Sequence, residues 1–466
     1  MSVPLSRFWA ELTNVLPEIA AAQYVAIDFE MTGIEPRNAL PLQRPTMDQL
    51  YKRAKEAAET FNVMQFGLTC ISYKEAAISG KDGGANGVFY LKSYNFNVSP
   101  MFDTHSNGGA FLARVLDRTL TLSYKTLMFL SKNRIRIEDA YDGGIPYLSR
   151  AEEAQIIAEL SGLQQHSKAE HIDIKKTQQE TKQFCADVTD KIRFWESDPS
   201  SNSYLNISNS HDGPMTRFQR RLVYQLLDTH FDRKYRAVVK ENYFMQITKR
   251  DNKAEEKLVG GSFAKDVYRM YELDAGLADD SVERKLGKSE EKLRAETPVL
   301  VGHNMFLDLC FLYTTFFGPL PDTLDGFGHI VHELFPRILD TKHILTHADH
   351  EMMPPKTLED VFLELQAKKM PFEIEHIQTR YTNRMHAANV HQAGHDSFKT
   401  SVVFLKEMWK HIEGISTTSH ENTGSCKRFD WESPVFQKFA NKVRIGNAGL
   451  WNFGADDALS LKNSET

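Results

Sequence analysis

The chain has 466 residues, too many for a single compact core, so we expect two to four domains of roughly 150 residues each. Hydrophobic residues make up 41% and charged residues 25%, as in a soluble globular protein, and no apolar run approaches the roughly 20 residues that span a bilayer. The formal charge of −6 is unlike that of a protein that coats duplex nucleic acid non-specifically, but it leaves room for local basic patches.

The first twenty residues predict an amphipathic helix. They lack the basic start, apolar centre and small-residue cleavage site of a signal peptide. The four cysteines lie far apart, which argues against a zinc site and a disulfide framework and favours a reducing compartment. We therefore expect an intracellular protein that is cytoplasmic, nuclear or both, with no membrane segment.

The next stretch, YVAIDFEMTGI, predicts a buried strand that carries Asp28 and Glu30 on the same face. Two carboxylates at this spacing repel each other and lose solvation when they are half-buried. Either the strand runs out into solvent at this point, where acids cost little, or a cation binds both side chains. The two residues alone do not decide between these interpretations.

Three further elements follow. TMDQLYKRAKEAAETFN predicts a helix that begins with a capping box of Thr46 and Gln49. VMQFGLTCISY (63–73) and GVFYLKSYNFNV (87–98) predict strands joined by a glycine-rich turn, and helices are expected from about residue 108. With the first strand, these two strands suggest a meander.

The region from about 150 to 295 is rich in Gln, Lys, Glu and Ser and predicts a small inserted domain. A break is expected at 197–214, followed by the amphipathic helix MTRFQRRLVYQLLDTHF and the strand-like YFMQITKR. DDSVERKLGKSEEKLRAE predicts a charged helical connector. Apolar strand character returns at PVLVGHN (298–304), and helices follow at MFLDLCFLYTTFF, near Thr357 and at HDSFKTSVVFLKEMWKHI. The fold class is α/β, with a βββαβα-like core and an insertion.

Two more acids stand at the ends of predicted elements. Asp308 lies one turn into an apolar helix after a buried strand, and Asp396 lies at the head of the last long helix. Either acid alone could simply favour a helix start. If Asp28, Glu30, Asp308 and Asp396 meet at one sheet edge, only cations can neutralise them, and oxygen ligands select Mg²⁺ or Mn²⁺. Two such ions about 3.5–4 Å apart can activate a water and stabilise the leaving oxygen of a phosphodiester.

The order D-x-E, then D, then H-x-x-x-x-D is the pattern of DEDD exonucleases of the histidine-bearing subclass. His391 lies five residues before Asp396, which in one ideal helix would be about 500°, so we expect it on the preceding loop. There it could act as a general base towards the attacking water. A tyrosine subclass would need Tyr where this chain has Gln392, and we expect His395 to serve packing or support rather than catalysis.

Several segments together resemble the poly(A)-specific ribonuclease (PARN) family, in the deadenylase group of DEDD enzymes. They are AIDFEMTGI, QFGLTCISY, KSYNFNV, GGIPYLSRAEE, TRFQRRLVYQLL, VGHNMFLDL, FPRILDTK and HQAGHDSF, in the family's order. The resemblance implies an RNase H-like nuclease interrupted by a small α/β nucleic-acid-binding domain of the Arg-x-x-x-His type. It implies nuclease parts at 1–160 and 271–453, an inserted domain at 161–270 and a polar tail at 454–466.

The resemblance also implies a function and a site. The enzyme would be a Mg²⁺-dependent 3′→5′ exoribonuclease that removes poly(A) tails or trims single-stranded RNA 3′ ends and releases 5′-nucleoside monophosphates. Two ions, which Mn²⁺ could replace, would bind Asp28, Glu30, Asp308 and Asp396, and His391 would be the base. The family's RNA contacts would fall on Met31, Ile34, Leu127, Phe129 and Lys342. A homodimer is also implied.

The sequence departs from the family in three places. Met31 replaces an aromatic residue, and Arg220 is followed four residues later by Tyr224 instead of His, although RFQRR keeps a basic face. We also expect no cap-binding domain after the nuclease. Two other functions stay open: a catalytically inactive relative that binds RNA or pairs with an active subunit, and a DEDD exonuclease that acts on DNA. The filled acid positions argue against the first, and the family resemblance argues against the second.

Overall fold

A computed structural model of the chain describes residue 3 and the following ranges: 5–36, 44–75, 87–102, 107–133, 135–141, 143–166, 172–197, 204–209, 213–231, 234–240, 243–249, 280–348, 356–377, 392–416 and 429–454. His391 and the predicted tail from 455 onward lie outside the described residues. The chain divides into two compact units, Met1–Ala154 with Ala275–Thr466, and Gln155–Asp274. The inserted domain predicted at 161–270 falls within the second unit. Among the described residues, no helix is long and apolar enough to cross a membrane.

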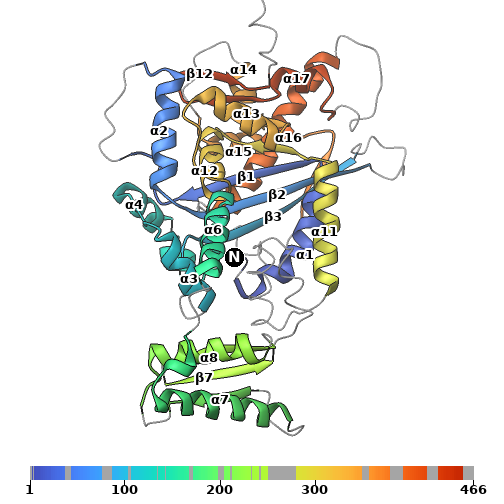
Figure 1. Cartoon of the computed structure of the whole chain (residues 1–466). Coiled ribbons are helices and arrows are strands. Elements are labelled where there is room, and N and C mark those ends of the chain that lie inside the picture. Colours follow the sequence, from blue (N-terminus) through green and yellow to red (C-terminus); the bar gives the residue numbers. More distant parts are fainter. Residues whose placement is uncertain are drawn as a thin grey trace, which may run out of the picture. The chain divides into compact units, whose positions relative to one another are not determined.

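A mixed β-sheet forms the centre of the first unit (Figure 1). Its strands run in the order β10-β3-β2-β1-β8-β9, and short β4 pairs with β3. The first three strands form the predicted antiparallel meander, whereas β8 and β9 add in parallel beside β1 and β10 adds in parallel beside β3. The bounds are β1 Tyr24–Met31, β2 Val63–Glu75, β3 Gly87–Ser99, β4 Ile145–Pro146, β8 Val299–Gly302, β9 Ile338–Asp340 and β10 Glu373–His376.

Helices cover both faces of this sheet. The helices described before and after the second unit are α1 Leu5–Ala21, α2 Met47–Thr60, α3 Asn107–Leu116, α4 Tyr124–Lys132, α5 Ile137–Tyr141, α11 Asp280–Ala295, α12 Phe306–Phe316, α13 Leu324–Leu334, α14 Thr341–Ala348, α15 Leu358–Gln366, α16 Ala393–Ser416 and α17 Pro434–Phe439, and α6 Arg150–His166 runs from the first unit into the second. A hairpin of β11 (Lys442–Ile445) and β12 (Gly449–Asn452) follows. The capping boxes at Thr46 and Thr357 confirm the predicted helix starts.

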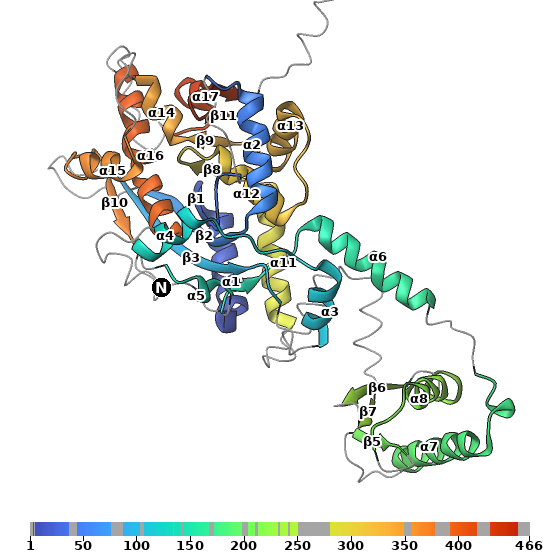
Figure 2. The ribbon, with the colours of Figure 1, turned by 90° about the vertical axis from the view of Figure 1, so that its left-hand side faces the viewer.

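The two faces of β1 belong to two different hydrophobic cores. Val25, Ile27 and Phe29 pack with residues of α2, α12 and α13. Tyr24 and Ala26 pack with residues of α14, α15 and α16. Figure 2 shows α15 and α16 together beside the edge strand β10, and the contacts between the two helices agree with that view. The alternation predicted for YVAIDFEMTGI is therefore confirmed, and the face that carries Asp28 and Glu30 looks towards α16.

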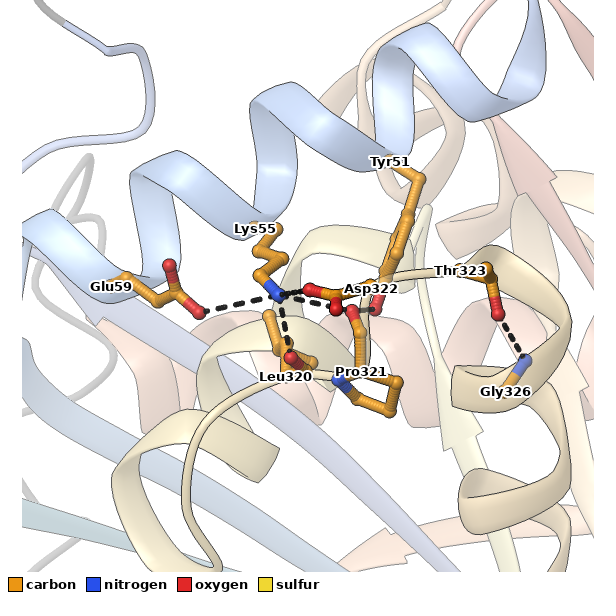
Figure 3. A network of polar contacts seen from close by, with 8 residues as sticks. All are labelled: Tyr51, Lys55, Glu59, Leu320, Pro321, Asp322, Thr323 and Gly326. Carbon is orange, nitrogen blue, oxygen red and sulfur yellow. Dashed lines mark hydrogen bonds and ion pairs between the residues drawn. The ribbon is translucent and has the colours of Figure 1, made fainter.

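A polar network fastens α2 to the loop between α12 and α13 (Figure 3). The Lys55 ammonium donates hydrogen bonds to the carbonyls of Leu320 and Pro321 at 2.7 and 3.2 Å and pairs with Asp322 at 2.8 Å. The Tyr51 hydroxyl donates to the Pro321 carbonyl at 2.6 Å. The ion pair itself contributes little because Asp322 is exposed, so the carbonyl contacts carry most of this attachment.

The second unit has its own core and its own sheet. Strands β5 (Tyr204–Ser208), β7 (Phe244–Lys249) and β6 (Tyr235–Lys240) form a three-stranded antiparallel sheet. Helices α7 (Gln179–Ser197) and α8 (Arg217–His230) share its hydrophobic core, and a short 3-10 turn spans Ile174–Lys176. The break expected at 197–214 is wrong in part, because β5 lies inside it. The polar composition of that segment hid a strand whose side chains are mostly exposed.

Gly67 lets α16 approach the sheet more closely than any other residue would. Gly67 pairs with Asp28 across β1 and β2, and a Cβ at this position would lie 1.9 Å from the backbone oxygen of Ala393, the first residue of α16. Because the three atoms nearest to the added carbon, from Ala393 and Gly394, all belong to backbone, none can move aside as a flexible side chain could. The first turn of α16 is therefore seated directly on β2, opposite Asp28.

We predict that Gly67→Ala destabilises the protein by about 1–3 kcal/mol, because the added carbon must push the start of α16 away from β2. The matched control is Gly287→Ala in the interior of α11, where an added Cβ meets no atom within 4 Å. That change should stabilise the protein by up to about 1 kcal/mol, because alanine favours a helix over glycine. Thermal unfolding of both variants checks this, and equal melting temperatures would contradict the close approach.

Candidate active site

Asp28 and Glu30 lie near the end of strand β1. They continue the face that Tyr24 and Ala26 bury against α16, so their side chains point at the start of that helix. The register of β1 on β2 shifts between Glu30 and Met31, which is a bulge at the end of the strand. Bulges of this kind re-aim side chains at the rim of a sheet. Both carboxylates are partly exposed there.

Buried hydrogen bonds hold the first turn of α16 on the sheet. The amide of Gly394 donates to the side-chain oxygen of Asn95 at 2.9 Å. The hydroxyls of Thr69 and Ser397 lie 2.8 Å apart, and Ser93 lies 2.9 Å from Thr69 on the other side. Because these groups are buried, losing one partner would leave the other unsatisfied at a cost of about 1–3 kcal/mol. This polar row fixes the helix start and so the position of Asp396 one turn later.

The structure brings three of the four predicted metal ligands together. One carboxylate oxygen from each of Asp28, Glu30 and Asp396 lies within 4.8 Å of the other two. Asp308, in the first turn of α12, is not part of this close group. Its carboxylate accepts a hydrogen bond from the backbone of Phe29, which places it beside β1. Asp308 is therefore a neighbour of the carboxylate triad formed by Asp28, Glu30 and Asp396.

The surroundings make a negative charge costly at these positions. Burial raises the pKa of Asp28 well above its usual value, and Asp308, Asp396 and Glu30 raise it further. Burial also raises the pKa of Glu30, with added repulsion from Asp396 and Asp308. The pKa of Asp308 is raised mainly by burial too. At an effective dielectric constant of 20, two like charges at this spacing repel by roughly 3–4 kcal/mol, so the metal-free cluster favours bound protons.

Lys399 is the cation that the structure places against this cluster. Its ammonium lies 3.0 Å from Oδ1 of Asp396 and also pairs with Glu359 on α15. Burial would lower the pKa of Lys399, but Asp396 and Glu359 outweigh it and raise that pKa, so the side chain is charged. Its charge also opposes the rise in the pKa of Asp28. The sequence analysis did not identify this contact.

A buried hydrogen-bond network lies at the ends of β8 and β9. Asp340 is fully buried and accepts backbone N–H groups of Asn304, Lys342 and Arg444 at 2.7, 3.0 and 3.1 Å. Burial raises the pKa of Asp340 to about 6 despite these bonds. Asn304 has a φ of 55°, in the left-handed region, and its bond to Asp340 supports that backbone.

His303 lies close enough to Lys342 and Asp396 to feel the charges of both. Its Nδ1 is 2.8 Å from the Thr341 hydroxyl. Burial and the charge of Lys342 lower the pKa of His303 to about 4, against the opposing effect of Asp396, so the imidazole is neutral at pH 7. The Lys342 ammonium donates to the carbonyl of Lys356 at 3.0 Å. His303 directly follows a buried strand, and this position in the sequence could have marked it as a candidate site residue.

The predicted RNA contacts come from three segments. Met31 is buried at the end of β1, whereas Ile34 is exposed just beyond it. Leu127 and Phe129 are exposed on α4. Buried Thr32 joins the first two segments: its hydroxyl donates to the Thr121 carbonyl at 2.6 Å, and its own carbonyl accepts the N–H of Ser123 at 2.9 Å. Ile34 and α4 are thus held near each other, while Lys342 lies on a third element, α14.

The supporting residues behave in part as expected. His395 stacks on Phe398 with ring centroids 6.3 Å apart, which agrees with a packing role. His391, the predicted base, lies outside the described residues. Gln392, which follows it, accepts the backbone N–H groups of His395 and Asp396 at 2.8 and 2.9 Å at the start of α16. Helix α16 therefore begins two residues after the predicted base in the sequence.

The donor set fits a hard divalent cation. Three carboxylate oxygens converge at a partly buried sheet edge, and burial, together with repulsion between the acids, raises the pKa of Asp28 and Glu30 there. Oxygen donors of this kind suit Mg²⁺ or Mn²⁺ rather than a soft metal. The described residues place no cysteine in this group, and the buried thiols of Cys70 and Cys310 have raised pKa values.

Comparison with known proteins identifies the family. The model of the CAF1 family ribonuclease matches residues 3–404, most of the chain. The chain belongs to the CAF1 ribonuclease family. This match confirms the expected ribonuclease resemblance and, with the mixed sheet and its covering helices, the RNase H-like α/β fold class.

Individual relatives are distant. The chain is 24% identical to the poly(A)-specific ribonuclease PARN of Xenopus laevis over 95% of this chain and 67% of that protein, and it spans 59% of the Danio rerio PARN. It is 23% identical to the pre-piRNA 3′-exonuclease trimmer of Bombyx mori over 98% of this chain and 80% of that protein. Among solved structures, S. pombe Pop2p in its Mg²⁺- and Mn²⁺-bound form aligns over 96% of this chain and 98% of its own, with 13% identity and a TM-score of 0.40.

The raised pKa values predict a pH-dependent stability. Folding raises the pKa of Asp28, Glu30 and Asp308, so the folded state binds protons more tightly than the unfolded chain. In EDTA, the contribution of these groups to stability should be greatest below the unfolded pKa of about 4 and should fall as pH rises towards about 8, the folded pKa of Glu30. Saturating Mg²⁺ should reduce this fall, because the ion compensates the deprotonated carboxylates.

Thermal unfolding between pH 5 and 8, with EDTA and with Mg²⁺, checks this expectation. The control variant is Glu30→Gln, which removes one titrating group and should flatten the EDTA profile. The same pH dependence in wild type and in Glu30→Gln would contradict the electrostatic interpretation.

Proposed function

We propose that this protein is a divalent-metal-dependent 3′→5′ exoribonuclease of the DEDDh type. It shortens single-stranded RNA 3′ ends by hydrolysis and releases 5′-nucleoside monophosphates. The observation that carries the proposal is the convergence of Asp28, Glu30 and Asp396 within 4.8 Å in a chain of the CAF1 ribonuclease family. The names of the PARN relatives support a poly(A) tail as substrate, and the name of the trimmer supports 3′-end trimming.

The metal would be Mg²⁺, or Mn²⁺ in its place. Asp28, Glu30 and Asp396 would hold it, and Asp308 would bind a second ion or support the first site from beside β1. When bound, a pair of such ions supplies Lewis-acid activation of water and stabilises the leaving oxygen of a phosphodiester.

The protein's own residues supply the remaining tasks. His391 precedes α16 in sequence and is proposed to take the proton from the attacking water, because an imidazole titrates near neutral pH. Lys342 is proposed to contact a phosphate, since its ammonium has two further N–H donors besides the one used by the Lys356 carbonyl. His303 is neutral and can hydrogen-bond to substrate without adding charge.

Two surfaces are proposed to hold RNA. Near the site, Ile34, Leu127 and Phe129 are exposed and could pack against bases. In the second unit, α8 exposes Phe218 and Tyr224 together with basic side chains of the RFQRR segment. One of these, Arg220, donates to the Met215 carbonyl at 2.7 and 3.0 Å and so also supports the helix start. The homodimer implied by the family resemblance stays a prediction.

Asp28→Asn and Asp396→Asn should each lower the rate of RNA 3′-end hydrolysis by at least about a hundredfold, because each removes a charged metal ligand. The matched control is Asp325→Asn, which removes an exposed acid in the first turn of α13 and should leave the rate unchanged. The measurement is a time course on a 5′-labelled single-stranded RNA with Mg²⁺, with circular dichroism to verify folding. Full activity in either site variant would sink the proposal.

His391→Ala should slow hydrolysis by roughly 10²- to 10⁴-fold, as expected for loss of a general base, while stabilisation by Mg²⁺ is retained. His395→Ala is the comparison, because His395 stacks on Phe398 and should affect stability more than rate. An unchanged rate in His391→Ala would mean that another group accepts the proton.

The RNA hydrolysis time course also distinguishes the proposed function from the two alternatives, a DNA exonuclease and a catalytically inactive relative. A matched DNA oligonucleotide that is degraded as fast as RNA would point to a DNA exonuclease. A wild-type protein that binds RNA but degrades neither substrate with Mg²⁺ or Mn²⁺ would point to a catalytically inactive relative.

A further inference from the structure

Lys399 is an unusual residue for its surroundings. It lies on α16 one turn after Asp396, and its side chain is only 6% exposed. Burying an ammonium costs several kcal/mol unless charges compensate it. Without compensating partners, a lysine at this position would have a lower free energy with its ammonium in solvent, which its long side chain could reach.

The contacts of Lys399 connect the site to a second helix. On one side, Nζ donates to Oδ1 of Asp396 at 3.0 Å. On the other side, it pairs with Glu359 in the first turn of α15, whose side chain is 40% exposed. The capping box of Thr357 and Asp360 fixes the start of α15. The ammonium is thus held between an inner carboxylate of the triad and an outer carboxylate at the surface.

We propose that Lys399 is a positioning residue of the active site, which holds one oxygen of Asp396 and compensates part of the charge of the carboxylate triad. This inference rests on the proposed metal-dependent function. It follows that the triad is oriented before a cation arrives. The positive charge of Lys399 also makes the net charge of the site less negative by one. A divalent cation therefore binds more weakly than it would to the acids without Lys399.

The proposal predicts opposite effects on stability and on metal binding. In Lys399→Met, which keeps the length of the side chain but not its charge, the metal-free protein should melt several degrees lower. The Mn²⁺ concentration that gives half of the maximal thermal shift should fall by roughly tenfold, because the uncompensated acids attract the ion more strongly. The melting temperature at saturating Mn²⁺ should approach that of the wild type.

Two further variants test the role of the charge. Lys399→Arg restores a cation and should return the half-saturating Mn²⁺ concentration towards the wild-type value. Glu359→Gln removes the outer carboxylate, so the ammonium compensates the triad more fully and the half-saturating concentration should rise. These measurements use the intact protein without RNA, in buffer treated to remove metal before Mn²⁺ is added.

The outcomes distinguish this inference from the proposed function. If Mn²⁺ shifts the melting temperature of the wild type but Lys399→Met has the same half-saturating concentration, only the inference is overturned. An equal loss of stability with and without Mn²⁺ would overturn it too, because Lys399 would then serve packing alone. If Mn²⁺ does not shift the wild type, the proposed metal site fails and the inference fails with it.

Discussion

The close approach of α16 to β2 is the constraint on which the rest of the site depends. Gly67 leaves no side chain between the strand and the backbone of Ala393, and Asn95, Thr69 and Ser397 add buried hydrogen bonds that fix the helix start. Asp396 follows one turn later, so its distance from β1 is set by backbone packing rather than by flexible side chains. A site built on rigid elements in this way keeps its acids together before any ligand binds.

That proximity has an electrostatic cost, which the structure meets in two ways. Lys399 lies against Asp396 and supplies one positive charge from within the protein, and its partner Glu359 ties it to α15. Burial and the remaining repulsion raise the pKa values of Asp28 and Glu30, and burial raises that of Asp308. A divalent cation bound by these carboxylates would relieve this repulsion, so the arrangement that destabilises the metal-free cluster would also provide the driving force for the proposed metal binding.

Much of this architecture follows from local patterns. The alternation in β1 predicts which face carries the acids, and the capping boxes at Thr46 and Thr357 predict where helices begin. Contacts between distant segments could not be predicted, because hydrophobic periodicity does not say which elements become neighbours. The parallel pairing of β10 with β3 is an example. Strand β5 was missed for a local reason, because its segment is polar and its side chains are mostly exposed. Lys399 was missed because its spacing from Asp396 is ordinary, and only the fold shows that both side chains are buried.

The central claim is that the carboxylate triad binds a divalent cation. Anomalous diffraction from crystals soaked in MnCl₂, recorded at the manganese edge, tests it most directly. The account predicts a manganese peak among the side chains of Asp28, Glu30 and Asp396, and its loss in crystals of Asp396→Asn. An ordered triad with no manganese peak at saturating MnCl₂, or a peak that persists unchanged in the variant, would contradict it.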